Sequence, residues 1–73
     1  MNRIDVPAFC HMFYDCKNIK IHGWYIENGE RVCKHRSYND KFDINIEREF
    51  RSFEVIQFKV TKKGFIDIIA TDF

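Results

Sequence analysis

The stretch IKIHGWYIENGERVCKH, residues 19–35, decides the fold that we expect for this chain. Its first half is rich in β-branched and aromatic residues, which favour strands, and Asn28-Gly29 is the pair preferred in two-residue type I′ turns. The pattern therefore predicts a hairpin that places Glu27 opposite Glu30. Because side chains alternate along a strand, one face of this hairpin carries two cross-strand pairs, His22 with His35 and Trp24 with Cys33.

A second hairpin is expected near the end of the chain, where residues 55–60 and 65–71 flank Lys62-Lys63-Gly64. Glycine suits the positive φ of a three-residue loop. Pairing Thr61 with Phe65 places Lys59 opposite Asp67, a charge pair worth about 0.2–1 kcal/mol. On the other face the same register pairs apolar residues only: Val60 with Ile66, Phe58 with Ile68 and Ile56 with Ala70.

Outside the hairpins the pattern predicts one helix and one further strand. Asp5 can cap a helix whose first turn contains Pro7, and the apolar residues that follow have helical spacing. These residues are Val6, Phe9, Cys10, Phe13 and Cys16, and they predict an amphipathic helix over residues 6–17. Further along, Phe42, Ile44 and Ile46 alternate with polar residues, which predicts a half-buried strand. Residues 48–52 are interpreted as a tight connection.

The composition supports an α+β domain made mostly of strands. The 73-residue chain has no leucine and only two alanines, whereas isoleucine and phenylalanine are abundant. This length predicts a single domain over residues 1–73. A short N-terminal helix followed by about five antiparallel strands can curl into a small barrel. In the order and length of its elements this layout looks like the SH3-like and Sm-like small barrels, although the chain lacks the strand glycines and motif residues of Sm-like proteins.

Composition also bears on where the protein works. No apolar run approaches the about 20 residues that a membrane helix needs, and residues 1–5 lack the layout of a signal peptide. Three cysteines, an odd number, do not form a closed disulfide framework. We therefore expect a cytoplasmic protein with reduced thiols and no membrane partner. The richness in Ile, Asn, Lys and Phe suits an AT-rich genome such as that of a phage or mobile element.

Soft ligands for zinc are present, but their spacing is poor. Four residues, Cys10, Cys16, Cys33 and His35, are the candidate ligands, and the chain has no Cys-x-x-Cys pair. We therefore interpret these side chains as packing residues and expect no metal or cofactor, with a small zinc-stabilised domain as an alternative. Cys33 beside His22 or His35 could form a thiol–imidazole pair. No phosphate-binding loop or serine nucleophile motif accompanies it, so we expect no enzyme.

The remaining hypothesis is a non-enzymatic interaction module that binds and modulates a protein partner. Trp and Arg dominate the binding energy of protein interfaces, and the first hairpin supplies the expected partner-binding residues Trp24, His22, Arg31 and His35. Tyr14, Tyr25, Phe50 and Phe73 could extend that patch, and sheet edges could pair with a second copy of the chain. The alternative is a small barrel that stacks single-stranded nucleic acid on the same face, against which the net charge of only +1 argues.

Overall fold

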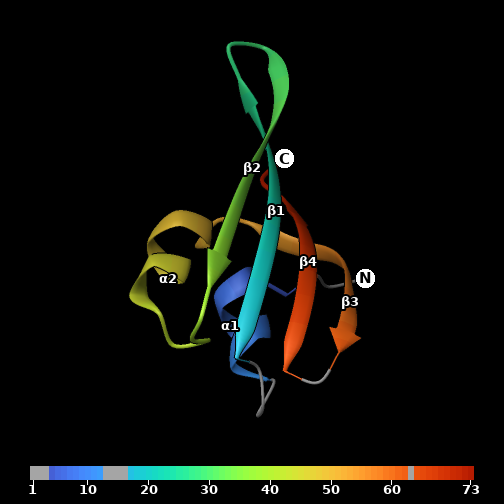
Figure 1. The fold of residues 1–73 in the computed structure, drawn as a ribbon. Helices are drawn as coiled ribbons and strands as arrows, with labels where there is room; N and C mark the ends of the chain where they lie inside the picture. Colours follow the sequence, from blue (N-terminus) through green and yellow to red (C-terminus); the bar gives the residue numbers. More distant parts are fainter. Residues whose placement is uncertain (1–3, 13–16, 63) are drawn as a thin grey trace.

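The computed structural model describes residues 4–12, 17–62 and 64–73 of the chain. The described residues form one sheet of four strands in the order β2-β1-β4-β3, in which β1 is parallel to β4 and the other neighbours are antiparallel (Figure 1). The elements in chain order are α1 (Val6–His11), β1 (Asn18–Glu27), β2 (Glu30–Tyr38), α2 (Ile44–Phe50), β3 (Glu54–Lys62) and β4 (Phe65–Thr71).

This topology confirms a strand-rich α+β chain and corrects three finer expectations. The described residues contain four strands rather than about five, they are not all antiparallel, and the sheet is open rather than a small SH3-like barrel. The difference arises at α2, which lies between β2 and β3 and carries the chain from one edge of the sheet to the other. A crossover of this kind is what allows two neighbouring strands, here β1 and β4, to run parallel.

Helix α2 forms where alternation predicted a strand. The Asp43 carboxylate caps it by accepting a hydrogen bond from the Asn45 backbone N–H at 2.9 Å. Ile46 and Phe50, one helical turn apart, are buried, whereas Phe42 and Ile44 remain 66% and 59% exposed. The strand prediction was wrong because the buried residues, Ile46 and Phe50, have helical spacing. The alternating pattern depends on Phe42 and Ile44, which face solvent.

Helix α1 begins at Val6, as predicted, and ends at His11 rather than at the predicted residue 17. The Asp5 side chain accepts a hydrogen bond from the Ala8 backbone N–H at 2.9 Å, and proline occupies the first turn. The apolar stripe of the described helix is buried, with Val6 and Cys10 in the core. The helix ends at His11, so residues 6–17 are not one continuous helix in the described chain, and residues 13–16 lie outside the described ranges.

Both helices pack on one face of the sheet, which we call the covered face. The core lies between the helices and the inward residues of β1 and β4. It consists of Val6, Phe9, Cys10, Ile19, Ile21, Tyr38, Ile46, Phe50, Phe53, Ile66, Ile68 and Ala70. In the described part of the chain neither helix covers the other face, which we call the open face, and Figure 1 shows α1 behind the sheet. The result is a two-layer domain.

Gly23 allows the two layers to meet closely. A Cβ atom at this position would lie 2.7 Å from Cε1 of Phe50 and 2.8 Å from Cε2 of Phe53. Both rings therefore rest directly on the β1 backbone, and Gly23 is the residue without a side chain that this contact requires. No pattern in the sequence predicts this role for Gly23.

The register of the first hairpin is confirmed pair by pair, including His22 with His35 and Trp24 with Cys33. Asn28 and Gly29 both have positive φ, 53° and 81°, as a type I′ turn requires. The register of the second hairpin is confirmed in its middle, where Lys59 pairs with Asp67.

The second hairpin departs from its predicted register at both ends. Lys62 rather than Thr61 pairs with Phe65, and Val55 rather than Ile56 pairs with Ala70. Two irregularities cause these shifts, one between Val60 and Lys62 and the other between Val55 and Gln57. Each is a β-bulge, which inserts one extra residue in the bulged strand and turns the following side chains.

The first hairpin extends beyond the rest of the sheet. Strand β4 pairs with β1 only as far as Trp24, so residues 25–32 pair as strands only with each other. We call these residues the arm, and Figure 1 shows it projecting from the body of the domain. The Asp72 backbone N–H donates to the Trp24 carbonyl at 2.8 Å, which holds the C-terminal segment at the base of the arm.

Strands β2 and β3 are the edges of the sheet. A bridge between Asp5 and Glu54 covers the start of β3. Neither of the two described helices has the length and apolar character that crossing a membrane requires.

Candidate interaction surface

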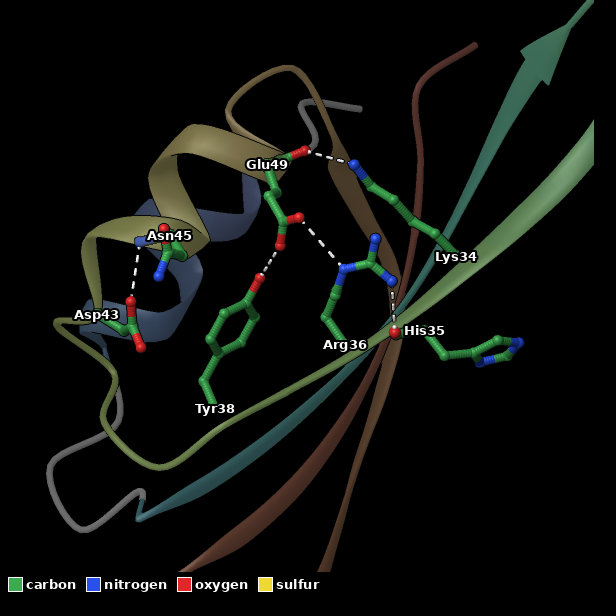
Figure 2. A network of polar contacts seen from close by, with 7 residues as sticks. All are labelled: Lys34, His35, Arg36, Tyr38, Asp43, Asn45 and Glu49. Carbon is green, nitrogen blue, oxygen red and sulfur yellow. Dashed lines mark hydrogen bonds and ion pairs between the residues drawn. The ribbon is translucent and has the colours of Figure 1, made fainter.

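A polar network joins β2 to α2 on the covered face (Figure 2). The Tyr38 hydroxyl donates a hydrogen bond to the Glu49 carboxylate, and Arg36 Nε donates to the same carboxylate at 3.2 Å. Burial and the Glu49 contact raise the pKa of Tyr38, and the hydrogen bond from Tyr38 holds the pKa of Glu49 below its usual value. Each charge has a matched partner, so we assign this network to holding α2 in place.

Lys34 on β2 also contacts α2, at a point closer to the arm. Its Nζ donates to the backbone carbonyl of Glu49 at 3.1 Å, and lies 4.9 Å from the ring centroid of Phe50 and 5.1 Å from that of Phe53. Cation–π contacts of this kind contribute about 0.5–2 kcal/mol each, depending on how far the charge is desolvated. Lys34 therefore closes the core beneath the base of the arm.

The open face carries all four residues expected to bind a partner: His22, Trp24, Arg31 and His35. Trp24 is 39% exposed, so it is a surface residue. The Nδ1 atoms of His22 and His35 lie 2.6 Å apart. Figure 2 shows the His35 ring pointing away from the α2 network. The structure thus brings the expected residues together on adjacent strands.

A hollow of about 370 Å³ lies at the base of the arm. Its walls are aromatic and aliphatic, and the Arg31 guanidinium lies 5.3 Å from the centroid of the Phe73 ring. The lining residues are Trp24, Arg31, Ile56, Thr71 and Phe73. Together with Ile26, which pairs with Arg31 on the same ribbon, the exposed members form what we call the arm patch: Trp24, Ile26, Arg31, Ile56 and Phe73.

Sequence reasoning missed part of this surface. Ile56 was expected on the apolar face of the second hairpin, but it lies at a β-bulge, is 49% exposed and lines the hollow. Phe50, in contrast, is fully buried and does not extend the patch. Phe73 does extend it, and Tyr14 lies outside the described residues. No local signal in the sequence places Ile56 beside Trp24, because that proximity depends on the pairing of β1 with β4.

Thr71 lies beneath the arm patch. It is only 6% exposed, and its hydroxyl has no hydrogen-bond partner among the described residues. An unsatisfied buried hydroxyl costs about 1–3 kcal/mol relative to a satisfied one. Thr71 therefore marks a locally unfavourable spot in the wall of the hollow.

The three candidate zinc ligands that the structure describes lie on two different faces of the sheet. Cys10 is buried in α1 on the covered face, Cys33 and His35 belong to the open face, and Cys16 lies outside the described ranges. Within those ranges no three His, Cys, Asp or Glu side chains form a metal-binding group. Burial raises the pKa of the Cys33 thiol, which disfavours the thiolate that nucleophilic catalysis needs. The geometry of the described residues therefore supports neither a zinc site at these residues nor catalysis by Cys33.

No protein-family model, curated protein or solved structure matches this chain. Function is therefore inferred from the chain's own residues. Trp and Arg are among the residue types most enriched in the hot spots of protein interfaces, and Trp24 and Arg31 lie together in the arm patch among exposed apolar side chains. The arm patch is thus the surface on which a functional proposal can rest.

Proposed function

We propose that this chain is a small non-enzymatic interaction module that binds and modulates a protein partner through the arm patch, with His22 and His35 at its border. One observation carries the proposal: large apolar side chains that the core does not use gather around Arg31. Trp24, Ile56 and Phe73 are 39%, 49% and 59% exposed and line one hollow. Exposed patches of this kind mark interaction sites more often than isolated exposed residues do.

The arm itself supports the same conclusion. A two-stranded hairpin is marginally stable in water without a third strand or a packed layer. Residues 25–32 have no third strand, and Tyr25 at the base of the arm packs against the core. Its tip places Glu27 directly opposite Glu30, a like-charge pair that is unfavourable in isolation. A partner that supplies an apolar side chain to the hollow, a carboxylate to Arg31 and a basic group to the tip would stabilise all three features.

The test is a paired substitution with a matched control. Trp24→Ala with Arg31→Ala removes an aromatic residue and a cation from the arm patch. Lys41→Ala with Phe42→Ala removes the same kind of pair elsewhere, where Lys41 Nζ lies 5.2 Å from the Phe42 ring centroid.

The tagged full chain and both double variants are used to capture partners from the source cells, and affinity is then measured with the captured protein. Losing a hot-spot residue costs about 2 kcal/mol or more, which is roughly a 30-fold loss of affinity. We expect this loss for the arm-patch variant and none for the control. A folded arm-patch variant that binds the same protein with unchanged affinity would refute the proposal.

A second candidate function is binding of single-stranded nucleic acid on the open face. It is favoured by Trp24 and His22 on β1, an interior strand, with Lys20 on the same face. Against it, Asp67 lies opposite both Lys20 and Lys59 in register, so their charge is partly neutralised.

Salt dependence separates the two candidates. With a fluorescent oligothymidylate as probe, log affinity falls against log salt with a slope of about −0.7 for each phosphate contact. An apolar protein interface shows no slope of that size. Binding of the probe with a steep slope would favour the second candidate, and absence of binding would remove it.

A further inference from the structure

We propose that His22 and His35 form a two-histidine chelating site for a divalent transition-metal ion such as Cu²⁺, Ni²⁺ or Zn²⁺ on the open sheet face. The inference goes beyond protein binding and does not depend on it. It also differs from the zinc site considered from the sequence, because it uses neither Cys10 nor Cys33.

The hairpin places the two rings face to face. In a two-residue hairpin the pair that flanks the turn, here Glu27 and Glu30, exchanges backbone hydrogen bonds, and the pairs then alternate along the ribbon. Counting from the turn makes His22 and His35 a non-hydrogen-bonded pair, the kind whose side chains lie closer together. The register therefore brings the two side chains within reach of each other.

The imidazole geometry is near that of a chelate. The ring centroids are 4.8 Å apart, the rings are inclined by 79°, and the Nδ1 atoms are separated by 2.6 Å. Zinc–nitrogen bonds of about 2.0–2.1 Å in a tetrahedral site place two ligand nitrogens about 3.3 Å apart. Opening the pair by less than about 1 Å thus admits an ion, and the exposure of His35 leaves its ring room to turn.

The ion would replace a proton. At 2.6 Å one Nδ1 donates and the other accepts, so the contact holds a single proton between two lone pairs. A metal ion bound to both nitrogens satisfies both lone pairs at once. Because the described residues supply no third ligand at this point, water or a partner's side chain completes the coordination. Affinity should then follow the general preference of imidazole sites, with Cu²⁺ bound more tightly than Ni²⁺ or Zn²⁺.

The surrounding charges neither create nor block this site. Lys20 lies on the same strand and face as His22, and Lys59 and Asp67 line a hollow of about 250 Å³ together with His22. Cys33, two residues before His35 on β2, lies on the same face. With two ammonium groups and one carboxylate nearby, attraction of a cation by the local field is weak. Binding therefore has to come from the two imidazoles themselves.

The experiment titrates the purified full chain with Cu²⁺, Ni²⁺, Zn²⁺ and Mg²⁺ at pH 7.5, followed by calorimetry and by NMR of the imidazole nitrogens. We expect one transition-metal ion per chain, no binding of Mg²⁺, and resonance changes at His22 and His35. His11, an exposed histidine on α1, is the internal control and should not respond.

Substitutions identify the ligands. His22→Gln and His35→Gln should each lower the affinity at least roughly tenfold, since a chelate gains from the high effective concentration of its second ligand. His11→Gln should leave it unchanged, and an amide spectrum of each variant verifies that it is folded. Saturable binding that survives both His22→Gln and His35→Gln, or no saturable binding below millimolar metal, would overturn the proposal. Either result leaves the arm patch untouched, because no partner is present in the titration.

Discussion

Replacing Gly23 with alanine adds one methyl group where β1 meets the two phenylalanine rings of the covered layer. The new Cβ would lie 2.7 Å from a Phe50 ring carbon and 2.8 Å from a Phe53 ring carbon. Non-bonded carbon atoms pack at about 3.5–4.0 Å, so the overlap is roughly 0.7 Å or more against each ring. Phe50 is fully buried and Phe53 is 3% exposed, which leaves little free space into which either ring can turn.

The magnitude follows from two opposing effects. Overpacking a core by a methyl group typically costs about 1–3 kcal/mol, and displacement of two rings places Gly23→Ala in the upper half of that range. Loss of a glycine from the unfolded chain returns about 0.4–1 kcal/mol. The net expectation is a destabilisation of about 1–2.5 kcal/mol. For a domain of this size, about 4–8 °C per kcal/mol gives a fall in Tm of roughly 5–20 °C.

The assay is urea and thermal unfolding followed by the fluorescence of Trp24, the only tryptophan and the next residue along β1. Lys20→Ala, on the exposed side of the same strand, is the control and should change the free energy of unfolding by less than about 0.5 kcal/mol. Shortening a ring relieves the overlap, so Gly23→Ala combined with Phe50→Leu should be less destabilised than the sum of the single variants. If Gly23→Ala is as stable as Lys20→Ala, the close contact between the layers is refuted.

Four further substitutions test other parts of the structure. Glu49→Gln should cost about 1 kcal/mol at neutral pH. Because the folded-state pKa of Glu49 is lowered, its contribution is present above the ordinary value of 4.5 and is lost as pH falls through the folded value, so urea midpoints of wild type and variant should converge in acid. Thr71→Val removes an unsatisfied hydroxyl and should be neutral or stabilising by about 1 kcal/mol in the same assay, whereas a clear loss would reveal a hydrogen-bond partner. Ile46→Ala should cost about 2–5 kcal/mol and Ile44→Ala less than about 0.5 kcal/mol, and similar losses from both would contradict the helix.

The parts of the fold that could be predicted are those set by neighbouring residues. The turn at Asn28-Gly29 specifies its own backbone conformation, and with a side-chain period of two it determines every pair of the first hairpin. The start of α1 is likewise local, because Asp5 caps a backbone group three residues away. In the second hairpin, the pairing of Lys59 with Asp67 is specified by charge. Each of these features needs no information about the rest of the molecule.

The order of the strands could not be predicted in this way. Residues 42–53 contain two apolar patterns at once, an alternating one through Ile44 and a helical one through Ile46, Phe50 and Phe53. The helical pattern prevails because the rings of Phe50 and Phe53 pack directly on the β1 backbone at Gly23. That packing site exists only in the folded chain. Once α2 forms, the chain reaches the far edge of the sheet and β4 returns parallel to β1. Composition therefore predicts the fold class, whereas the strand order depends on the tertiary contact of Phe50 and Phe53 with Gly23.

The candidate site likewise has one part that neighbouring residues specify and one part that depends on tertiary contacts. Its first half, Trp24 and Arg31, belongs to one hairpin and follows from the turn. Its second half, Ile56 and Phe73, reaches the same hollow only because β4 pairs with β1 as far as Trp24 and because β3 bulges at Ile56. A partner seated in this hollow would contact the arm, an edge strand and the C-terminal segment together. Binding there would join the tip of the arm to the body of the domain, to which the arm is already attached at its base by the contact of Tyr25 with Phe53 and of Arg31 with Phe73.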